Sequence, residues 1–284
     1  MTDLLSGREY AARLRERTAA EAARLAASGT PPRLAVVTAT ADESSAWYVR
    51  SIARAAEKCG IHCDIADLGP RATPADIGAR LAGLSADHAT HGVILQTPLP
   101  PGANAQELAA EIAVAKDVDG ANPLSLGRLA AGLPAFAPAT AEAVVAVLDA
   151  HGIEVAGRHV AVVGRSTVVG KPAALLLLDR DATVTVAHSR TQDLAALTGA
   201  ADIVVAAAGR PGLITADHIR PGVILVDVGT NPTPDGGLTG DIDAASVDGR
   251  AAALTPVPGG VGPVTTALLL QHTVRAAAEA TGAA

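Results

Sequence analysis

The sequence predicts an α/β protein with two domains, the second of which has a parallel sheet of the Rossmann type. Short apolar runs of strand length alternate with runs of helix length along most of the chain, as in βαβ units. The length of 284 residues suits two domains of ordinary size. Hydrophobic residues make up 49% of the chain and charged residues 18%, a globular composition, but aromatic residues make up only 1%. The cores are therefore expected to be aliphatic.

The N-terminal half is expected to contain three strands, each followed by a helix. A further helix over 139–151, ended by Gly152, is expected to connect this half to a second alternating series that starts at Gly157. The expected strands are 33–39, 62–68 and 92–100, and the expected helices are 43–59, 74–86 and 104–114.

Charge and composition exclude several classes of function. The formal net charge of -7 argues against a general affinity for nucleic acid or for an anionic membrane surface. The first residues mix acids and bases, unlike a signal or transit peptide, and no apolar run approaches the roughly 18 residues of a membrane span. A cytoplasmic protein is expected. Cys59 and Cys63 lack the further ligands of a structural metal site, so we expect buried, inert thiols and no metal.

The stretch "GRHVAVVGRSTVVGKPAALLLL" predicts a dinucleotide site. A buried strand over 159–163 meets Gly164 and a turn that opens a helix, where backbone N–H groups and the helix dipole can hold phosphates. No glycine lies between Gly164 and Gly170, so the G-x-G-x-x-G pattern is not met. A tight turn without a ligand is the alternative.

The next strand, 182–190, favours NADP over NAD. Its end offers His188, Ser189 and Arg190 where an NAD site has an acidic residue for the ribose 2′-hydroxyl. Hydroxyl and guanidinium groups suit a 2′-phosphate, and Arg165 in the preceding turn is a second candidate. Asp193 is expected to cap the next helix. Two further buried strands are expected within 201–212 and 221–231, each followed by a turn that contains glycine.

Five motifs in the same order make the chain similar to the bifunctional methylenetetrahydrofolate dehydrogenase and methenyltetrahydrofolate cyclohydrolase family. The resemblance implies a folate-binding catalytic domain of residues 1–138 plus 264–284, an NADP-binding domain of residues 139–263, a C-terminal helix that returns to the first domain, and a homodimer. The motifs are "QTPLP" (96–100), "KDVDG" (116–120), "VVGRSTVVGKP" (162–172), "HSRT" (188–191) and "TPVPGGVGPVT" (255–265).

The resemblance also implies site residues. Tyr48 matches a tyrosine that stacks on the p-aminobenzoyl ring of the folate, and Asp119 matches an aspartate that binds the pterin ring. A core tyrosine and a solvated turn acid are the alternatives, and Asp117 is expected to brace the loop. The loop 255–263 is expected to lie at the cleft, or else to be a rigid linker. The implied substrate-binding residues are Tyr48, Gln96, Leu99, Asp119, Pro258, Gly259 and Gly260, and the implied cofactor-binding residues are Gly164, Arg165, Ser166, Val169, Gly170, Ser189, Arg190, Gly209 and Thr230.

One departure from the family pattern concerns catalysis. The family has Tyr-Val-x-x-Lys-x-Lys where this chain has "YVRSIAR", so Ile52 stands at the position of the catalytic lysine that works beside Gln96. Hydride transfer mainly needs positioning, whereas hydrolysis of the methenyl group needs proton transfer that isoleucine cannot provide. We therefore expect dehydrogenase activity, with weak or absent cyclohydrolase activity.

Smaller departures at 138–143, Asn122 and Thr230 keep other hypotheses open. The first alternative is a fully bifunctional enzyme that uses another group for the hydrolysis. The others are a specialised paralogue that acts on a modified folate, and an inactive protein that binds NADP or folate.

Overall fold

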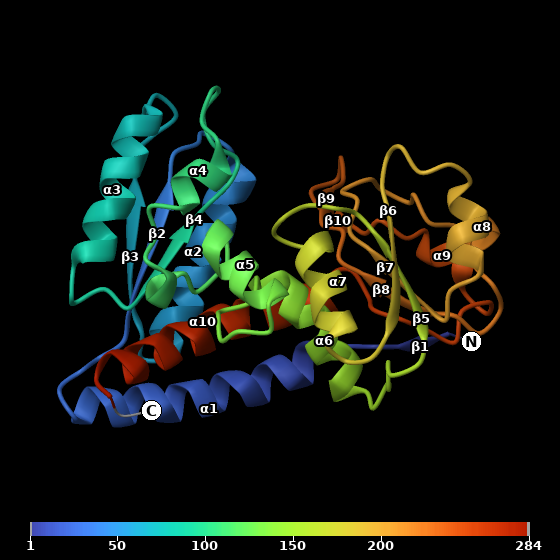
Figure 1. The fold of residues 1–284 in the computed structure, drawn as a ribbon, viewed down its shortest axis with the longest axis horizontal. Coiled ribbons are helices and arrows are strands. Elements are labelled where there is room, and N and C mark those ends of the chain that lie inside the picture. Colours follow the sequence, from blue (N-terminus) through green and yellow to red (C-terminus); the bar gives the residue numbers. More distant parts are fainter. Residues whose placement is uncertain (1, 283–284) are drawn as a thin grey trace. The chain divides into compact units, whose positions relative to one another are not determined.

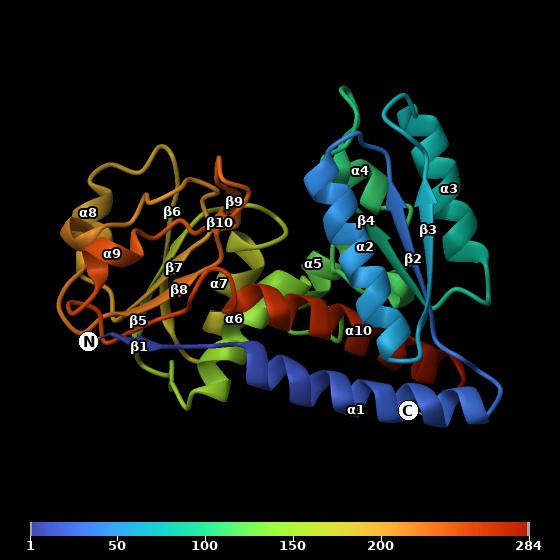
Figure 2. The same ribbon diagram turned by 180° about the vertical axis from the view of Figure 1, so that it is seen from behind.

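The computed structural model describes residues 2–282, and within it the chain folds into two compact units (Figures 1 and 2). We call residues 12–139 and 266–282 the three-stranded unit, and residues 2–11 and 140–265 the six-stranded unit. The two-domain α/β architecture predicted from the sequence is confirmed, as is a C-terminal helix whose residues from 266 onward belong to the unit formed by the N-terminal half.

The three-stranded unit has a parallel sheet in the order β3-β2-β4. Ala35 of the central strand is paired with Asp64 on one side and with Val93 on the other. Its elements are most of α1 (Arg8–Ala27), β2 (Arg33–Thr38), α2 (Glu43–Lys58), β3 (His62–Asp67), α3 (Pro74–Ala86), β4 (Gly92–Leu95), α4 (Ala105–Ala109), a 3-10 turn (Val114–Lys116), α5 (Pro123–Ala130) and most of α10 (Val261–Ala280).

Helices cover both faces of this sheet. Ala35 and Val37 of β2 pack with Ile77 and Leu81 of α3 in one apolar cluster. Because side chains alternate along a strand, Leu34 and Val36 point to the other face, along which α2 runs in both ribbon views. The expected aliphatic core is therefore present on both sides of the sheet.

Local sequence explains where α2 begins and ends. The Asp42 side chain accepts a hydrogen bond from the Ser45 backbone N–H at 2.7 Å, which caps the N-terminus. Gly60 follows the helix with φ +72°, a conformation that glycine adopts without strain. One stripe of the helix is buried and consists of Ser45, Val49, Ile52 and Ala56.

The six-stranded unit has a parallel sheet in the order β1-β11-β8-β7-β5-β6. Strand order reverses at β5, whose neighbours β6 and β7 both come later in the chain, and this reversal is the switch point at which such sheets bind ligands. The elements are β1 (Asp3–Leu4), α6 (Ala139–Ala150), β5 (His159–Val163), α7 (Gly170–Leu178), β6 (Thr183–Ala187), α8 (Leu194–Gly199), β7 (Ile203–Ala206), a 3-10 turn (Ala216–His218), β8 (Ile224–Asp227), the hairpin β9 (Asn231–Pro232) and β10 (Leu238–Thr239), α9 (Ala244–Val247) and β11 (Ala253–Leu254).

Three of the predicted elements are clearly shorter than expected, and one of them is the strand predicted over 182–190, which spans only Thr183–Ala187. The strand predicted over 92–100 ends at Leu95, because the prolines from Pro98 onward lack the N–H groups that would continue its pairing with β2. The helix predicted over 104–114 ends at Ala109. Ser85 at the end of α3 binds the backbone of Glu111 and Ala113 at 2.8 and 2.9 Å, which draws that segment out of the helix.

Other predictions concern single residues. Asp193 caps α8 through a 3.0 Å hydrogen bond from the Ala196 N–H, as expected. The prediction of two buried thiols is correct for Cys59 only, since Cys63 is half-buried. Within residues 2–282, no helix is both long and apolar enough to cross a membrane.

Candidate functional site

Tyr48 and Asp119 lie close together in the three-stranded unit. Burial raises the pKa of the Tyr48 phenol, the nearby Asp119 carboxylate raises it further, and a hydrogen bond with Thr266 of α10 acts in the opposite direction. The half-buried Tyr48 ring comes from the first turns of α2, and Asp119 comes from the loop between the 3-10 turn and α5. The two residues implied for folate binding are thus brought together.

The Asp119 carboxyl is held in an environment that favours its protonated form. Desolvation and then the charge of Asp117 raise its pKa to about 7, against the lowering effects of the Ala139 backbone N–H and of His272. A carboxyl group with a pKa near neutrality can both bind a donor and take up a proton. Such a perturbed acid is typical of a functional site.

Asp117 braces the loop that carries Asp119. It is fully buried and accepts hydrogen bonds from the N–H groups of Ala121 and Asn122 and from the Ser125 hydroxyl, at 2.6 to 2.9 Å. This confirms the expected bracing role. Asn122, one of the departures from the family pattern, caps α5 by accepting from the Leu124 N–H at 2.7 Å.

Two more contacts fix the same loop. His272 of α10 makes a 2.7 Å hydrogen bond to the Val118 carbonyl through Nδ1. Gly120 has φ +60°, and a Cβ there would lie 2.5 to 2.7 Å from the backbone of the segment 136–138. Glycine is therefore required for the chain to pass so closely. Sequence reasoning missed His272, because a lone histidine in an apolar helix gives no motif.

Gln96 and Leu99 follow the end of β4 and are both half-buried. The Gln96 side chain donates to the Thr97 carbonyl through Nε2 at 2.6 Å, and its backbone N–H donates to Val37 at 2.8 Å. Both residues lie in the segment that leaves the carboxyl edge of the sheet, where α/β proteins carry their functional side chains.

Ile52 has no solvent exposure and belongs to the buried stripe of α2. The family pattern places position 52 one turn beyond Tyr48 and beside Gln96. The structure groups Ile52 with Val49 and Ala56 in the buried stripe. An isoleucine at this position contributes to packing and offers no acid, base or charge.

The turn after β5 is built by close backbone contacts. Gly164 has φ +142°, and a Cβ there would collide with the Ala207 carbonyl that follows β7. A Cβ on Gly170 would collide with Gly164 itself. The Ser166 hydroxyl accepts from the N–H groups of Val169 and Gly170 at 3.1 and 3.4 Å. The two glycines thus make the tight turn although the usual middle glycine is missing.

The turn after β6 presents cation and hydroxyl groups. Ser189 and Arg190 are exposed, and the Arg190 N–H donates to His188 Nδ1 at 3.1 Å, which fixes the turn. Arg165 is also exposed, and all three residues belong to the six-stranded unit. The carboxylate of Asp193 is engaged in its helix cap. These groups suit a phosphate ester better than a free ribose hydroxyl.

Two buried aspartates that sequence reasoning missed organise the loops after β7 and β8. Asp241 is fully buried and accepts from the N–H groups of Ala208, Gly209 and Arg210 at 2.6 to 2.9 Å. It also accepts from the Asn231 side chain at 2.9 Å, and Asn231 follows the exposed Thr230. One carboxylate therefore shapes both loops that hold predicted cofactor residues.

Asp227, at the end of β8, supports Asp241 in turn. It accepts from the N–H groups of Gly229, Asp241 and Ile242, each at 2.9 Å. Burial raises its pKa to about 6, while these hydrogen bonds lower it and the charge of Asp241 raises it. In the sequence, both aspartates resemble ordinary turn acids, so no motif identifies them as functional residues.

Within the loop 255–263, close packing explains why two positions are glycine. Gly259 and Gly260 are buried, and the Gly259 carbonyl accepts from the Gly7 N–H at 3.0 Å. A Cβ on Gly259 would lie 2.9 Å from Arg8 Nε. Pro258 is exposed. The loop is thus a turn packed against Gly7 and Arg8.

The six-stranded unit has a parallel sheet with a glycine turn at its switch point, and the three-stranded unit carries a carboxyl group with a raised pKa. These features define a class of dinucleotide-dependent enzymes. Comparison with known families narrows the class. Residues 5–119 match "Tetrahydrofolate dehydrogenase/cyclohydrolase, catalytic domain", and residues 138–281 match "Tetrahydrofolate dehydrogenase/cyclohydrolase, NAD(P)-binding domain". The chain belongs to the tetrahydrofolate dehydrogenase/cyclohydrolase family, which confirms the resemblance of the motifs.

Individual relatives are similar to this protein in sequence or in fold over nearly the whole chain. "Bifunctional protein FolD 1" of Saccharopolyspora erythraea is 66% identical over 97% of this chain and 94% of its own length. The FolD enzyme of Campylobacter jejuni has the same fold, with a TM-score of 0.95 and 37% identity over 98% of this chain and 99% of that one. A Trypanosoma brucei FolD solved with NADP and an inhibitor gives a TM-score of 0.93 and 35% identity, over 99% and 98% of the two chains.

Proposed function

We propose that the chain oxidises 5,10-methylenetetrahydrofolate to 5,10-methenyltetrahydrofolate with NADP. The observation that supports this most is that Asp119, whose pKa is raised to about 7, lies near enough to Tyr48 for its charge to raise the pKa of the phenol, in a member of this family. In this proposal the Tyr48 ring stacks on the p-aminobenzoyl group. The ionised Asp119 accepts hydrogen bonds from the amino and ring N–H groups of the pterin.

The reaction transfers a hydride from the one-carbon bridge to NADP. The bridge loses two electrons with that hydride, and the folate nitrogens share the positive charge that remains. The protein needs no proton transfer for this step, so its task is to hold the two partners in register. Gln96, Leu99 and Pro258 are proposed to contribute to the folate side, with Gly259 and Gly260 shaping the loop that presents Pro258.

NADP is proposed to bind the six-stranded unit at its switch point. The turn Gly164–Gly170 and the N-terminus of α7 would hold the phosphates. Arg165, Ser189 and Arg190 would hold the 2′-phosphate, and Gly209 and Thr230 would lie on the loops shaped by Asp241. The Trypanosoma brucei relative that was solved with NADP supports this choice of cofactor.

Cyclohydrolase activity is proposed to be weak, because Ile52 is buried and cannot transfer a proton. A second candidate is a fully bifunctional enzyme, which the names of the relatives favour, since the Saccharopolyspora erythraea and Rhodococcus jostii proteins are both called bifunctional. In that case another group activates the water. A homodimer is also proposed from the family resemblance, and sedimentation of the purified chain tests it.

Two assays separate these candidates. NADPH formation from methylenetetrahydrofolate distinguishes a dehydrogenase from an inactive binding protein. Loss of methenyltetrahydrofolate in the presence of the wild-type chain should proceed close to the spontaneous rate, and rapid hydrolysis would establish the bifunctional candidate.

The cofactor proposal has its own test. Replacing Arg165 and Arg190 by alanine should remove most of the preference for NADP over NAD. Arg180→Ala is the matched control, since Arg180 is exposed and pairs with Asp149. Equal use of both cofactors by the wild type would refute the assignment of the 2′-phosphate site.

A further inference from the structure

His272 is a buried histidine of α10 that contacts the loop carrying Asp119. The residue is 1% exposed, and its Nδ1 forms a 2.7 Å hydrogen bond with the Val118 carbonyl. A carbonyl oxygen can only accept, so Nδ1 donates this bond whether the ring is neutral or charged. The imidazole is therefore fixed at the peptide group that joins Val118 to Asp119.

Packing against an aromatic ring also fixes the imidazole. The centroids of the His272 and Phe136 rings are 5.1 Å apart, with an interplanar angle of 43°, and Phe136 is itself buried. The Arg275 guanidinium lies over the Phe136 ring, 4.1 Å from its centroid. His272 cannot turn away from the Val118 carbonyl without breaking this packing as well as its hydrogen bond.

Charged groups from two elements surround the imidazole. In the loop, Asp117 precedes the bonded carbonyl and Asp119 follows it. On α10 itself, Arg275 lies one turn further along and its Nε pairs with Glu279 at 3.4 Å. Desolvation and then Asp117 raise the pKa of Asp119 to about 7, whereas the charge of His272 lowers it. Burial also raises the pKa of Asp117, and His272 again acts in the lowering direction. A protonated imidazole thus opposes two buried acids.

The helix α10 acts on both residues that are proposed to bind the folate. Thr266 in its second turn forms a hydrogen bond with Tyr48, while His272 holds the loop of Asp119. A neutral donor at position 272 would be enough to hold the Val118 carbonyl. An imidazole can in addition carry a positive charge, which a neutral amide cannot.

We propose that His272 is a positioning residue for the folate substrate and that it acts through Asp119. Its hydrogen bond fixes the peptide group before Asp119, and its positive charge favours the carboxylate form that accepts from the pterin. The inference rests on the proposed function and adds a residue to it. Neither effect requires contact between His272 and the substrate.

Substitution by asparagine separates the two effects, because asparagine keeps a donor near the position of Nδ1 and carries no charge. In His272→Asn the pKa of Asp119 should rise by about one unit. Its ionised fraction at pH 7 then falls about fivefold, so the folate KM should rise about fivefold at pH 7 and stay within about twofold of the wild type at pH 8.5. The values of kcat and of KM for NADP should be unchanged, since only binding of the folate is altered.

Substitution by leucine removes the hydrogen bond as well as the charge. In His272→Leu the folate KM should rise more than about tenfold at pH 7 and also at pH 8.5, because the loop itself is no longer held. An Asn profile that coincides with the wild-type profile, or a Leu variant with the wild-type KM at both pH values, would overturn the proposal. His272→Gln, also a neutral donor, should shift the profile as Asn does and decides the question if the Asn variant does not fold.

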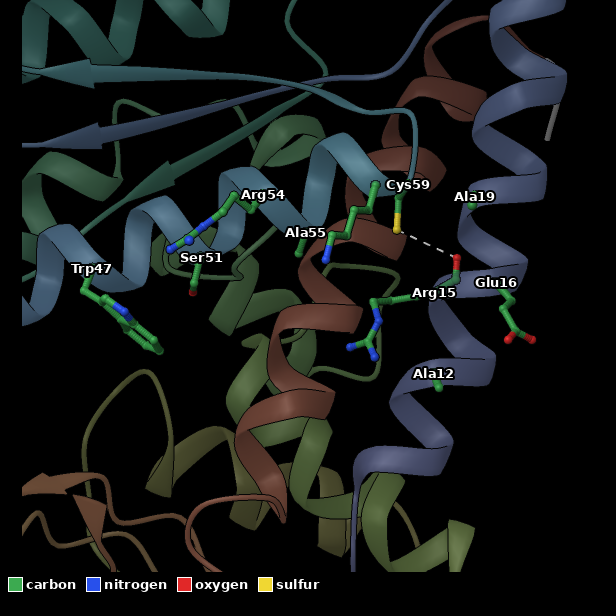
Figure 3. A pocket seen from close by; sticks show the side chains of 10 residues that line it. Ala12, Arg15, Glu16, Ala19, Trp47, Ser51, Arg54, Ala55 and Cys59 are labelled. Atoms are coloured by element: carbon green, nitrogen blue, oxygen red, sulfur yellow. Dashed lines mark hydrogen bonds between the residues drawn. The ribbon is translucent and has the colours of Figure 1, made fainter. Parts of the chain in front are cut away.

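Two control variants leave the contacts of His272 intact. The groove between α1 and α2 of the same unit is lined by other residues, among them Arg15 (Figure 3). Arg15→Gln removes a cation from this groove. His62→Asn removes an exposed imidazole of β3 that pairs with Asp64 at 2.9 Å. Both variants should keep the folate KM profile of the wild type, since neither alters the charges that act on Asp119.

Failure of this inference is distinguishable from failure of the proposed function. Normal NADPH formation with an unshifted Asn profile would refute the role of His272 and leave the dehydrogenase intact. No NADPH formation by the wild type would refute the dehydrogenase. Calorimetric titration with 5-formyltetrahydrofolate measures folate affinity without turnover. Its pH dependence in the wild type and the Asn variant would then still decide whether His272 acts on Asp119.

Discussion

Replacing Asp119 by asparagine tests the perturbed carboxyl group in the folate site. The pKa of Asp119 is raised from 3.8 to about 7, first by desolvation and second by Asp117. Asparagine has nearly the same shape and can still accept from the Ala139 N–H, but it does not titrate. The variant therefore removes the ionisation and keeps the packing.

The sign of the effect follows from proton linkage. In the unfolded chain Asp119 ionises near pH 4, whereas in the folded chain it stays protonated until about pH 7. The folded state thus binds more protons in this interval, and the free energy of unfolding falls as the pH rises through it. The shift is equivalent to at most about 4 kcal/mol, and partial hydration of the half-buried side chain reduces this to about 2 kcal/mol.

Urea unfolding followed by Trp47 fluorescence measures this effect within the three-stranded unit. Between about pH 5 and about pH 8, the Asn variant should gain about 2 kcal/mol relative to the wild type. Its folate affinity should fall at pH 8, since a neutral amide replaces a charged acceptor, and wild-type affinity should weaken below about pH 7. Parallel pH profiles for wild type and variant would show that Asp119 titrates normally and would refute this reasoning.

Three other substitutions test separate features. Asp241→Ala leaves three backbone N–H groups and one side-chain donor without their acceptor. NADP affinity should therefore fall more than tenfold, and the free energy of unfolding should fall by about 3 to 5 kcal/mol. An NADP affinity that calorimetry finds unchanged would exclude the bracing role. Gly164→Ala should destabilise by more than about 2 kcal/mol in thermal unfolding, because its Cβ meets the Ala207 carbonyl, whereas Gly157→Ala, with positive φ but open space, should cost about 1 kcal/mol. Ile52→Lys buries an ammonium group and should lower stability by about 3 kcal/mol in urea; a neutral effect would mean that the side chain reaches water, as a cleft-facing position requires.

The sequence predicted the fold well where elements are long and periodic. The runs that became β2, β5 and β7 are largely apolar and bounded by turn residues, which leaves little choice of structure. The two-residue strands β1, β9, β10 and β11 were not expected, because a pair of residues has no period. β1 and β11 form because distant chain segments supply their partners, whereas β9 and β10 pair with each other in a hairpin.

The candidate site was predictable where motifs exist and not where packing decides. Tyr48 and Asp119 were found from family motifs, and the structure adds that the charge of Asp119 raises the pKa of Tyr48. Ile52 was found because the family pattern has its catalytic lysine there, and the structure adds that position 52 continues the buried stripe of α2. Asp227 and Asp241 serve backbone donors from loops far apart in sequence, and no local pattern announces such bonds.

The edge of the six-stranded sheet bears on how the chain folds during synthesis. Asp3 and Leu4 of β1 pair in parallel with Ala253 and Leu254 of β11, so β1 has to wait for a partner that is synthesised after most of both units. The three-stranded unit has the same dependence, because α10 is part of it and contains residues up to Ala280.

Neither unit can therefore complete its contacts until β11 and α10 have been synthesised. Domains usually fold one after the other as they emerge, but here both depend on segments that follow most of their other residues. Until then β1 and the surfaces that α10 will cover stay open. Ribosome-bound chains that stop before residue 253 should consequently remain sensitive to protease along both units, and extension of the chain beyond α10 should protect the two units together.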